Sequence, residues 1–197
     1  MIELRSTHLD PALPLVVGLH GKGGSPERFA HQFDGADLAN DVILIEGFIA
    51  DEDRAAWFEW PPNTSDDQLA GLVTAAEARL WSVIAKLAHG RKVIVTGFSQ
   101  GAVMTYALAA KHPEQIAYAF PIAGRLPAKL APTARGAPIY ALHGVDDPIV
   151  EIAYGRSAIA GFSAAGGPAQ LHEFPATVHT VSAEMRAELL SRIKAVK

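Results

Sequence analysis

The sequence predicts an α/β protein with a mostly parallel central sheet and helices on both of its faces. Short, continuous apolar runs alternate along the chain with longer segments of helical period, which is the pattern of alternating strands and helices. The apolar runs also lack the polar–apolar alternation of a half-exposed strand. Strands without that alternation are buried on both faces, as in a parallel sheet covered by helices.

Six segments are expected to be strands, because each is a short apolar or β-branched run. They are residues 13–21, 41–47, 92–98, 116–124, 137–144 and the weaker 169–174. Right-handed crossovers between parallel strands bring the carboxyl ends of the strands to one edge of the sheet. An active site is therefore expected along that edge.

Four segments are expected to be helices. The clearest begins at Ser65, which stands three residues before Gln68 in the spacing of a capping box, and Gly90 ends it. Between these positions, apolar residues recur every three to four residues. The other expected helices are residues 100–112, which Pro113 closes, 149–165 and 181–196.

Length and composition exclude several classes of protein. With 197 residues, of which 49% are apolar, the chain can bury one sizeable core and is expected to form a single domain over residues 1–197. The formal net charge of −4 and the scattered lysines and arginines argue against a nucleic-acid-binding surface. The chain has no cysteine, so disulfides, thiolate zinc sites and cysteine nucleophiles are excluded.

The hydropathy of the chain predicts a cytoplasmic protein without stable membrane insertion. No apolar run reaches the roughly 18 residues that a membrane helix needs. The N-terminal stretch MIELRSTHLD also lacks the basic segment and apolar core of a signal peptide.

The most informative stretch is Gly97-Phe98-Ser99-Gln100-Gly101, which joins an expected strand to an expected helix. So sharp a turn forces its central residue into strained backbone space, and the flanking glycines remove collisions. Such a nucleophile elbow holds the serine hydroxyl at the edge of the sheet, above a helix N-terminus. The alternative is a tight turn that merely needs small residues, and the flanking strand and helix favour the elbow.

A serine nucleophile needs a general base, and in this kind of fold the base follows the serine in the chain. Three histidines lie well downstream of Ser99: His143, His172 and His179. The first two fall in expected strands, whereas His179 falls in a loop between the last strand and the last helix. Such a loop can bring an imidazole over the elbow, so His179 is the predicted base.

The acid that orients the base should lie between the serine and the histidine. Asp146 and Asp147 follow the expected strand 137–144, and either carboxylate could bond the second ring nitrogen of His179. In the alternative, the two aspartates serve only the backbone of an Asp-Pro turn. The residues themselves do not separate the two carboxylates.

The glycine-rich loop after the first expected strand, Gly21-Lys22-Gly23-Gly24, is predicted to complete an oxyanion hole. Its spacing fits neither a Walker loop nor a dinucleotide fingerprint. The backbone N–H of Lys22 or of Gly23, together with that of Gln100, could stabilise an oxyanion. The alternative is a plain turn after a strand.

No metal and no cofactor are expected. The stretch from His172 to His179 lacks the i, i+4 histidine pair of a zinc-protease helix, and Pro175 prevents a helix there. Acyl transfer by an activated serine needs neither.

Four blocks of the sequence resemble the phospholipase/carboxylesterase family of α/β-hydrolases, which includes bacterial carboxylesterases and acyl-protein thioesterases. They are His20-Gly21-Lys22-Gly23, Gly97-Phe98-Ser99-Gln100-Gly101, His143-Gly144-Val145-Asp146-Asp147-Pro148-Ile149-Val150 and Val178-His179. The resemblance covers most of the chain and implies an α/β-hydrolase fold. Members of the family are often dimers, which implies that a homodimer can form.

The resemblance also implies roles for individual residues. Ser99 would be the nucleophile and His179 the general base. The acid of the family directly precedes a proline, which selects Asp147 over its neighbour. The oxyanion donors would be the backbone N–H groups of Lys22 and Gln100.

The sequence departs from the family pattern at several positions. Ala102 replaces a second glycine after Gln100, and Lys22 stands where the family often has an apolar residue. Residues 46–54 replace a proline-rich segment, and the chain is somewhat short, so loops over the acyl site are expected to be trimmed. These departures spare the predicted catalytic residues and concern the substrate.

The sequence thus predicts a serine carboxylesterase for small carboxylic esters or thioesters. Gly23, Trp57 and Phe58 are the candidate substrate-binding residues; with Trp60, the two aromatic residues either form an apolar wall or anchor their loop on the core. A trimmed cover favours short, soluble esters. The alternatives are a lysophospholipase or acyl-protein thioesterase, a peptidase or lactonase, and a non-catalytic scaffold that binds a small ligand.

Overall fold

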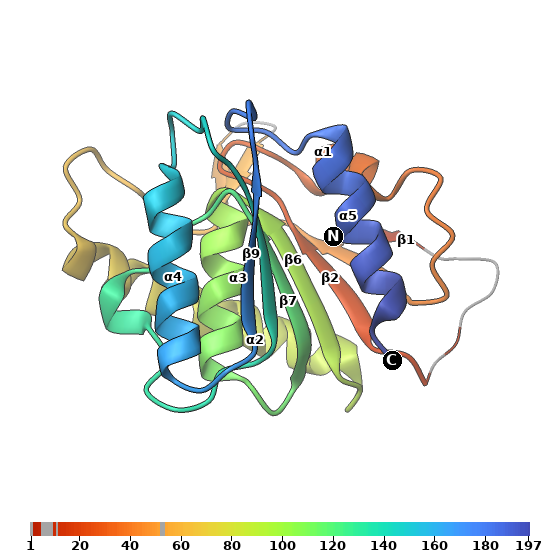
Figure 1. Cartoon of the computed structure of the whole chain (residues 1–197). Helices are drawn as coiled ribbons and strands as arrows, with labels where there is room; N and C mark the ends of the chain where they lie inside the picture. The colour runs from red at the N-terminus through yellow and green to blue at the C-terminus, as the bar shows by residue number, and fades with distance from the viewer. Residues whose placement is uncertain (1, 5–9, 11, 52–53) are drawn as a thin grey trace.

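A seven-stranded β-sheet forms the centre of the computed structural model, which describes residues 2–4, 10, 12–51 and 54–197 (Figure 1). Across the sheet the strands are β1 (Ile2–Leu4), β3 (Val42–Ile45), β2 (Leu15–Leu19), β6 (Val93–Phe98), β7 (Ile116–Ile122), β8 (Ile139–Gly144) and β9 (Ala169–Phe174). Only the pairing of β1 with β3 is antiparallel. The predicted sheet and its six predicted strands are confirmed.

Helices cover both faces of this sheet (Figure 1). On one face lie α2 (Asp66–Ala88), α3 (Gln100–Lys111) and α4 (Ile152–Ala164), and on the other lie α1 (Pro26–Ala30) and α5 (Ala183–Ala195). Two short 3-10 helices, η1 (His31–Phe33) and η2 (Ala128–Leu130), complete the secondary structure. All four predicted helices are present, so the α/β class is confirmed. Within the described residues, no helix is long and apolar enough to span a membrane.

The central strands are buried on both faces, which explains their continuous apolar runs. In β2, Leu15, Val17 and Leu19 pack into the core beneath α2, α3 and α4. Val16, between them in sequence, packs into the second core beneath α1 and α5. Because successive side chains of a strand point to opposite faces, a strand between two cores is apolar at most positions.

The predicted capping box of α2 is present at its first turn. The Ser65 hydroxyl accepts a hydrogen bond from the Gln68 backbone N–H at 3.2 Å, and the Gln68 side chain accepts one from the Ser65 N–H at 2.9 Å. The helix ends at Ala88, slightly before the predicted stop. His89 is its C-cap in the left-handed region, with φ 48°, and Gly90 follows with φ 82°.

Several short elements escape prediction: β1, α1 and a hairpin of β4 (Ile49–Asp51) and β5 (Arg54–Ala56). Each has too few residues to show a periodic pattern. The hairpin nevertheless shapes the site, because it is hydrogen-bonded to the loop after β2. The Gly23 N–H donates to the Ala55 carbonyl at 2.9 Å, and the Ala55 N–H donates to the Gly24 carbonyl at 3.1 Å.

Candidate active site

Ser99 lies at the sharp turn between β6 and α3, with φ 54° and ψ −115°. This conformation is unusual for a non-glycine residue, costs about 1–3 kcal/mol and persists only where the surrounding fold imposes it. A Cβ on Gly97 would lie 2.5 Å from the Gly101 carbonyl oxygen, and a Cβ on Gly101 would lie 2.2 Å from the Leu19 carbonyl oxygen. Both positions therefore require glycine, because backbone packs directly on backbone around the serine.

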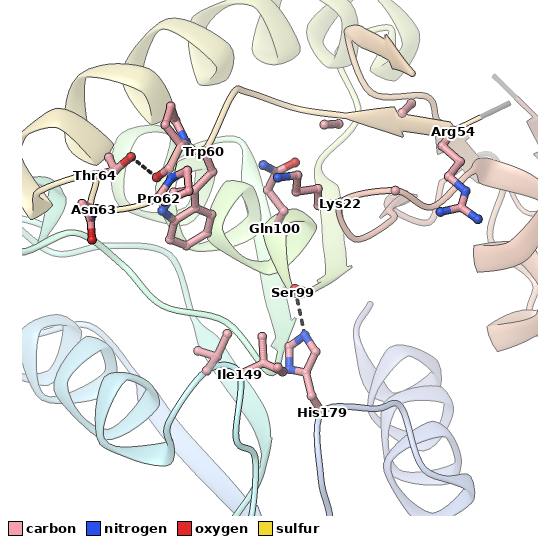
Figure 2. A pocket seen from close by; sticks show the side chains of 15 residues that line it. Lys22, Arg54, Trp60, Pro62, Asn63, Thr64, Ser99, Gln100, Ile149 and His179 are labelled. Atoms are coloured by element: carbon pink, nitrogen blue, oxygen red, sulfur yellow. Dashed lines mark hydrogen bonds between the residues drawn. The ribbon is translucent and has the colours of Figure 1, made fainter. Parts of the chain in front are cut away.

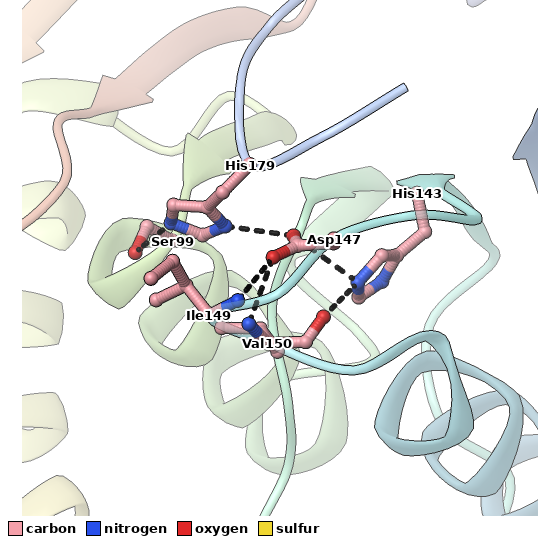
Figure 3. A network of polar contacts seen from close by, with 6 residues as sticks. All are labelled: Ser99, His143, Asp147, Ile149, Val150 and His179. Atoms are coloured by element: carbon pink, nitrogen blue, oxygen red, sulfur yellow. Dashed lines mark hydrogen bonds and ion pairs between the residues drawn. The ribbon is translucent and has the colours of Figure 1, made fainter. Parts of the chain in front are cut away.

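The structure brings Ser99, His179 and Asp147 together (Figure 3). The His179 Nε2 lies 2.9 Å from the Ser99 Oγ, and the His179 Nδ1 lies 2.7 Å from the Asp147 Oδ2. When Nδ1–H donates to the carboxylate, Nε2 is left as an acceptor for the serine hydroxyl. The three residues lie at or just after the carboxyl ends of β6, β8 and β9, at the predicted edge of the sheet.

The two candidate acids differ in whether their side chains reach the histidine. Asp147 is 4% exposed and faces His179, whereas Asp146 is exposed on the surface. The Asp147 Oδ1 also accepts the backbone N–H groups of Ile149 and Val150, both at 2.9 Å. The carboxylate thus binds the backbone of its own Asp-Pro turn with one oxygen and contacts the histidine with the other. The predicted contact with His179 and the alternative role in the turn are therefore both present.

The buried histidine His143, which falls in a predicted strand, supports the same turn. The His143 Nε2–H donates to the Val150 carbonyl at 2.7 Å, and the same nitrogen lies 3.6 Å from the Asp147 Oδ2 (Figure 3). His143 is 1% exposed, and burial lowers its pKa below the ordinary value, which favours the neutral ring. Its Nδ1 packs against Gly155, where a Cβ would come within 2.7 Å.

Of the two backbone donors proposed in the loop after β2, only one is not already engaged within the described residues. The Gly23 N–H is engaged by the Ala55 carbonyl, so it is not available to a substrate. Among the described residues, no hydrogen bond engages the backbone N–H of Lys22 or of Gln100. The geometry therefore favours Lys22 and Gln100 as the pair of donors, although Gly23 still lines the cavity.

His20 ties this loop to the end of β3. The Gly47 N–H donates to the His20 Nε2 at 2.9 Å, and the His20 Nδ1–H donates to the Gly21 carbonyl at 2.7 Å. One ring nitrogen thus accepts and the other donates, as only a neutral imidazole can do. Burial lowers the pKa of His20 below its ordinary value, in agreement with this arrangement.

Trp57 and Phe58, predicted as substrate-binding residues, do not line the cavity. They are 1% and 3% exposed and belong to the core. The Gln100 side chain holds their backbone: its Oε1 accepts the Trp57 N–H and its Nε2 donates to the Phe58 carbonyl, both at 2.8 Å. The Trp57 indole N–H donates to the His20 carbonyl at 2.8 Å. Of the two interpretations, the structure therefore supports the anchoring of the loop.

A cavity of about 780 Å³ opens in front of Ser99 (Figure 2). Trp60 is the aromatic residue on its wall, and the other apolar lining residues are Ala55, Ala56, Pro61, Pro62, Ile149 and Val150. Lys22 and Arg54 supply two cationic side chains. Trp60, Arg54 and Ile149 lie on loops or on the short hairpin, so the sequence offered no periodic signal that could have placed them. Within the described part of the chain, no group of side chains could hold a metal ion.

Comparison with known proteins places the chain in a family. Residues 6–197 match the family model described as Phospholipase/Carboxylesterase. The chain belongs to the phospholipase/carboxylesterase family. It is thus a member of an esterase-type family of hydrolases, and the resemblance inferred from the four sequence blocks is confirmed.

Two curated relatives match part of the chain. "Putative esterase NocK" of Nocardia uniformis subsp. tsuyamanensis is 31% identical over 153 residues, and "Probable carboxylesterase Os04g0669500" of Oryza sativa subsp. japonica is 28% identical over 152 residues. Each alignment covers 71% of this chain, but only 42% of the first relative and 57% of the second. The chain therefore spans about half of the length of these relatives.

Solved structures of esterases and thioesterases share the fold. Esterase PE8 superposes with a TM-score of 0.88 at 19% identity, over 100% of this chain and 98% of that one. The Bacillus cereus carboxylesterase gives 0.82 at 16% identity, with 98% and 93% covered, and the Zea mays acyl-protein thioesterase 2 gives 0.77 at 18%, with 98% and 97% covered. The α/β-hydrolase fold of this phospholipase/carboxylesterase family member is thereby confirmed.

Proposed function

We propose that this family member is a serine carboxylesterase that hydrolyses small carboxylic esters, or thioesters, through an acyl-serine intermediate. The observation that carries the proposal is the hydrogen-bonded series from the Ser99 hydroxyl through His179 to the Asp147 carboxylate, at 2.9 and 2.7 Å. A serine hydroxyl is a weak nucleophile at neutral pH, and an adjacent imidazole oriented by a carboxylate is the arrangement that activates it.

In the acylation step, the Ser99 Oγ attacks the ester carbonyl carbon while His179 Nε2 takes the hydroxyl proton. The developing imidazolium is stabilised by the buried Asp147 carboxylate, which stays ionised. His179 then gives its proton to the leaving alcohol or thiol as the tetrahedral intermediate collapses, and an acyl-serine remains. Water attacks this acyl group in the second step, and His179 again takes and returns the proton.

The free backbone N–H groups of Lys22 and Gln100 are the proposed donors to the oxyanion of both tetrahedral intermediates. One such donor is worth about 3 kcal/mol in the transition state. Gln100 begins α3, so its N–H belongs to a helix N-terminus that favours negative charge. The loop of Lys22 is fixed to β5 by two hydrogen bonds, which keeps this donor in place before the substrate arrives.

A lysophospholipase or acyl-protein thioesterase is the second candidate, because the apolar cavity continues beyond the serine. A neighbouring cavity of about 500 Å³ shares Pro61, Pro62, Asn63 and Thr64 with the first and extends to Leu72. A long acyl chain could lie along this combined groove. A short-ester preference is nevertheless the first candidate, since the sequence predicts trimmed loops over the acyl site.

The test is a series of initial rates on 4-nitrophenyl esters from acetyl to palmitoyl, with wild type beside Ser99→Ala and the exposed control Ser163→Ala. Turnover that requires Ser99 and peaks at short chains supports a small-ester carboxylesterase. A rate that climbs steadily towards palmitoyl would replace it with the second candidate. If Ser99→Ala, shown by circular dichroism to be folded, hydrolysed these esters as fast as wild type, the serine mechanism would be wrong.

A further inference from the structure

The charges around the cavity differ from those of the chain as a whole. The chain has 21 acidic and 17 basic residues, and its formal net charge is −4. The cavity in front of Ser99 is nevertheless lined by two basic residues, Lys22 and Arg54, and no carboxylate is among its described lining residues. A cavity lined by one sign of charge attracts and retains ligands of the opposite sign.

Neither cation is neutralised by a neighbour that the structure describes. Four other arginines are engaged in ion pairs: Arg91 with Asp41, Arg125 with Asp66, Arg156 with Glu173 and Arg192 with Glu188. Lys22 and Arg54 form no ion pair or side-chain hydrogen bond within the described residues. No described residue thus engages their donors, and a guanidinium can bind a carboxylate or a phosphate through two N–H groups at once.

The two cations are placed where a bound ester would meet them. Lys22 follows Gly21 in the proposed oxyanion loop, and its backbone N–H is a proposed donor. Arg54 lies alongside the same loop: a Cβ on Gly23 would be 3.9 Å from the Arg54 Cδ. In Figure 2, Arg54 lies to the upper right of Ser99 and Trp60 to its upper left, with Lys22 between them, so Arg54 and Trp60 stand on opposite sides of the view.

The positive lining continues on the other side of the loop. A smaller cavity of about 300 Å³ shares Lys22, Gly23 and His179 with the first, and it is lined by a further cation, Arg28. Again, no carboxylate is among its described lining residues. Three cationic side chains, Lys22, Arg54 and Arg28, therefore line the two cavities that border the proposed oxyanion loop.

We propose that Lys22 and Arg54 form an anion subsite, and that the preferred substrates are small esters carrying a carboxylate or phosphate group near the scissile bond. This inference rests on the proposed esterase function. The apolar wall at Trp60 would contact the uncharged part of the substrate, and the two cations would contact the anionic group. The same chemistry could come from an anionic lipid head group, and the experiment below separates that source from a soluble ester.

The experiment compares mono-4-nitrophenyl adipate, which carries a carboxylate on its acyl chain, with its neutral methyl ester. In wild type, kcat/KM for the anionic ester should exceed that for the neutral ester by about tenfold at low salt, and 0.5 M NaCl should reduce this ratio through screening. Lys22→Gln and Arg54→Gln should each lower the ratio by about threefold, the scale of one exposed charge contact. Lys86→Gln, an exposed charge on α2 outside the cavity, should not change it.

Other results would overturn the inference. A wild-type ratio near one, or a ratio that neither cavity variant lowers while the neutral ester is turned over, would remove the anion subsite and leave the esterase function intact. If neither ester were turned over, the proposed function would fail, and binding would decide the inference. The Ser99→Ala protein should then bind monomethyl adipate more tightly than dimethyl adipate in an NMR titration, and equal affinities would overturn the subsite.

Vesicles test the lipid source. Wild type and the double variant Lys22→Gln/Arg54→Gln are sedimented with phosphatidylcholine vesicles that contain or lack phosphatidylglycerol. Absence of cation-dependent sedimentation is expected if the anion belongs to a soluble ester. Sedimentation that needs both the anionic lipid and these two cations, with an unchanged ester ratio, would assign the cations to a lipid surface and contradict the proposal.

Discussion

The two sides of the cleft around Ser99 are built in opposite ways. On the acid side, Asp147 is 4% exposed and both of its carboxylate oxygens are hydrogen-bonded. On the wall side, Arg54, Pro61 and Pro62 are exposed, and the Arg54 side chain has no hydrogen bond to any described residue. The fold thus fixes the proposed acid through buried and satisfied contacts, whereas the proposed substrate wall consists partly of exposed side chains that can change without loss of the fold.

The largest expected effect comes from replacing one oxygen of the Asp147 carboxylate by an amide nitrogen. Asp147→Asn should reduce kcat/KM for 4-nitrophenyl acetate by about 10⁴-fold, because an amide cannot hold His179 in the required tautomer. The exposed neighbour provides the matched control, since Asp146→Asn should stay within about threefold of wild type. The reverse ranking would show that the other carboxylate orients the histidine.

A second prediction concerns the support beneath the serine, where Ala102 in the first turn of α3 meets Gly124 after β7. A Cβ on Gly124 would lie 2.4 Å from the Ala102 Cβ, so Gly124→Ala should lower the free energy of unfolding by about 3 kcal/mol. Ala102→Gly should restore most of this loss in the double variant. Urea denaturation of the four proteins measures the coupling between the two positions.

The control for this prediction is Gly71→Ala on α2, where nothing lies within 4 Å of the added methyl group. That substitution should raise the free energy of unfolding by up to about 1 kcal/mol, through helix propensity. If Gly124→Ala lowered the free energy of unfolding no more than Gly71→Ala, the close packing between Gly124 and Ala102 would be incorrect.

Substitution of the two tryptophans next to the site compares the hydrogen-bonded oxyanion loop with the wall of the cavity. Trp57→Phe removes the N–H that holds the His20 carbonyl, so the proposed oxyanion loop should shift and kcat should fall by about tenfold. Trp60→Leu changes the wall and a ring contact with Phe58 but no hydrogen bond of the loop, so KM should change while kcat stays within about twofold. Steady-state kinetics on 4-nitrophenyl butyrate distinguishes the two, and equal effects on kcat would contradict the division of the cleft.

The fold was predictable from the sequence because its determinants are local or periodic. Every residue of β2 is apolar because the strand lies between two cores, and the helix caps at Ser65 depend on neighbours three residues away. The elements β1, β4 and β5 were not predictable, since each has three residues and gains its stability from partners elsewhere in the chain.

The site was predictable in its residue types but not in all of its assignments. Asp146 and Asp147 both follow β8, and only the direction of the turn separates them. Trp57 remained open between a substrate wall and an anchor on the core, because an aromatic residue suits both a core and a pocket. Its place is decided by the Gln100 side chain, 43 positions away in sequence, which no local pattern could reveal.

The smallest expected effect is a pH dependence of stability that arises from the two buried histidines. Burial lowers the pKa of His20 and of His143 below 6.5, so the unfolded chain binds more protons than the folded one as the pH falls through 6.5. Their stabilisation is complete above pH 6.5 and is lost towards lower pH. At pH 5.5 each should cost at most about 1.4 kcal/mol of unfolding free energy.

Urea denaturation at pH 7.5 and 5.5 tests this sign. His143→Gln should reduce the loss of unfolding free energy between the two pH values, whereas His89→Asn, at an exposed helix end, should leave it unchanged. An equal pH dependence in wild type and His143→Gln would show that this histidine is not held neutral by the fold.

The central claim is that Ser99 is a nucleophile activated by His179, and covalent labelling tests it most directly. Wild type is treated with a fluorophosphonate, and the adduct is located by intact-mass and peptide mass spectrometry. We predict one adduct per chain, on Ser99, formed at least about a hundredfold more slowly in His179→Ala and absent from Ser99→Ala. An adduct on a different residue, or labelling of Ser99 that is equally fast without His179, would contradict the account.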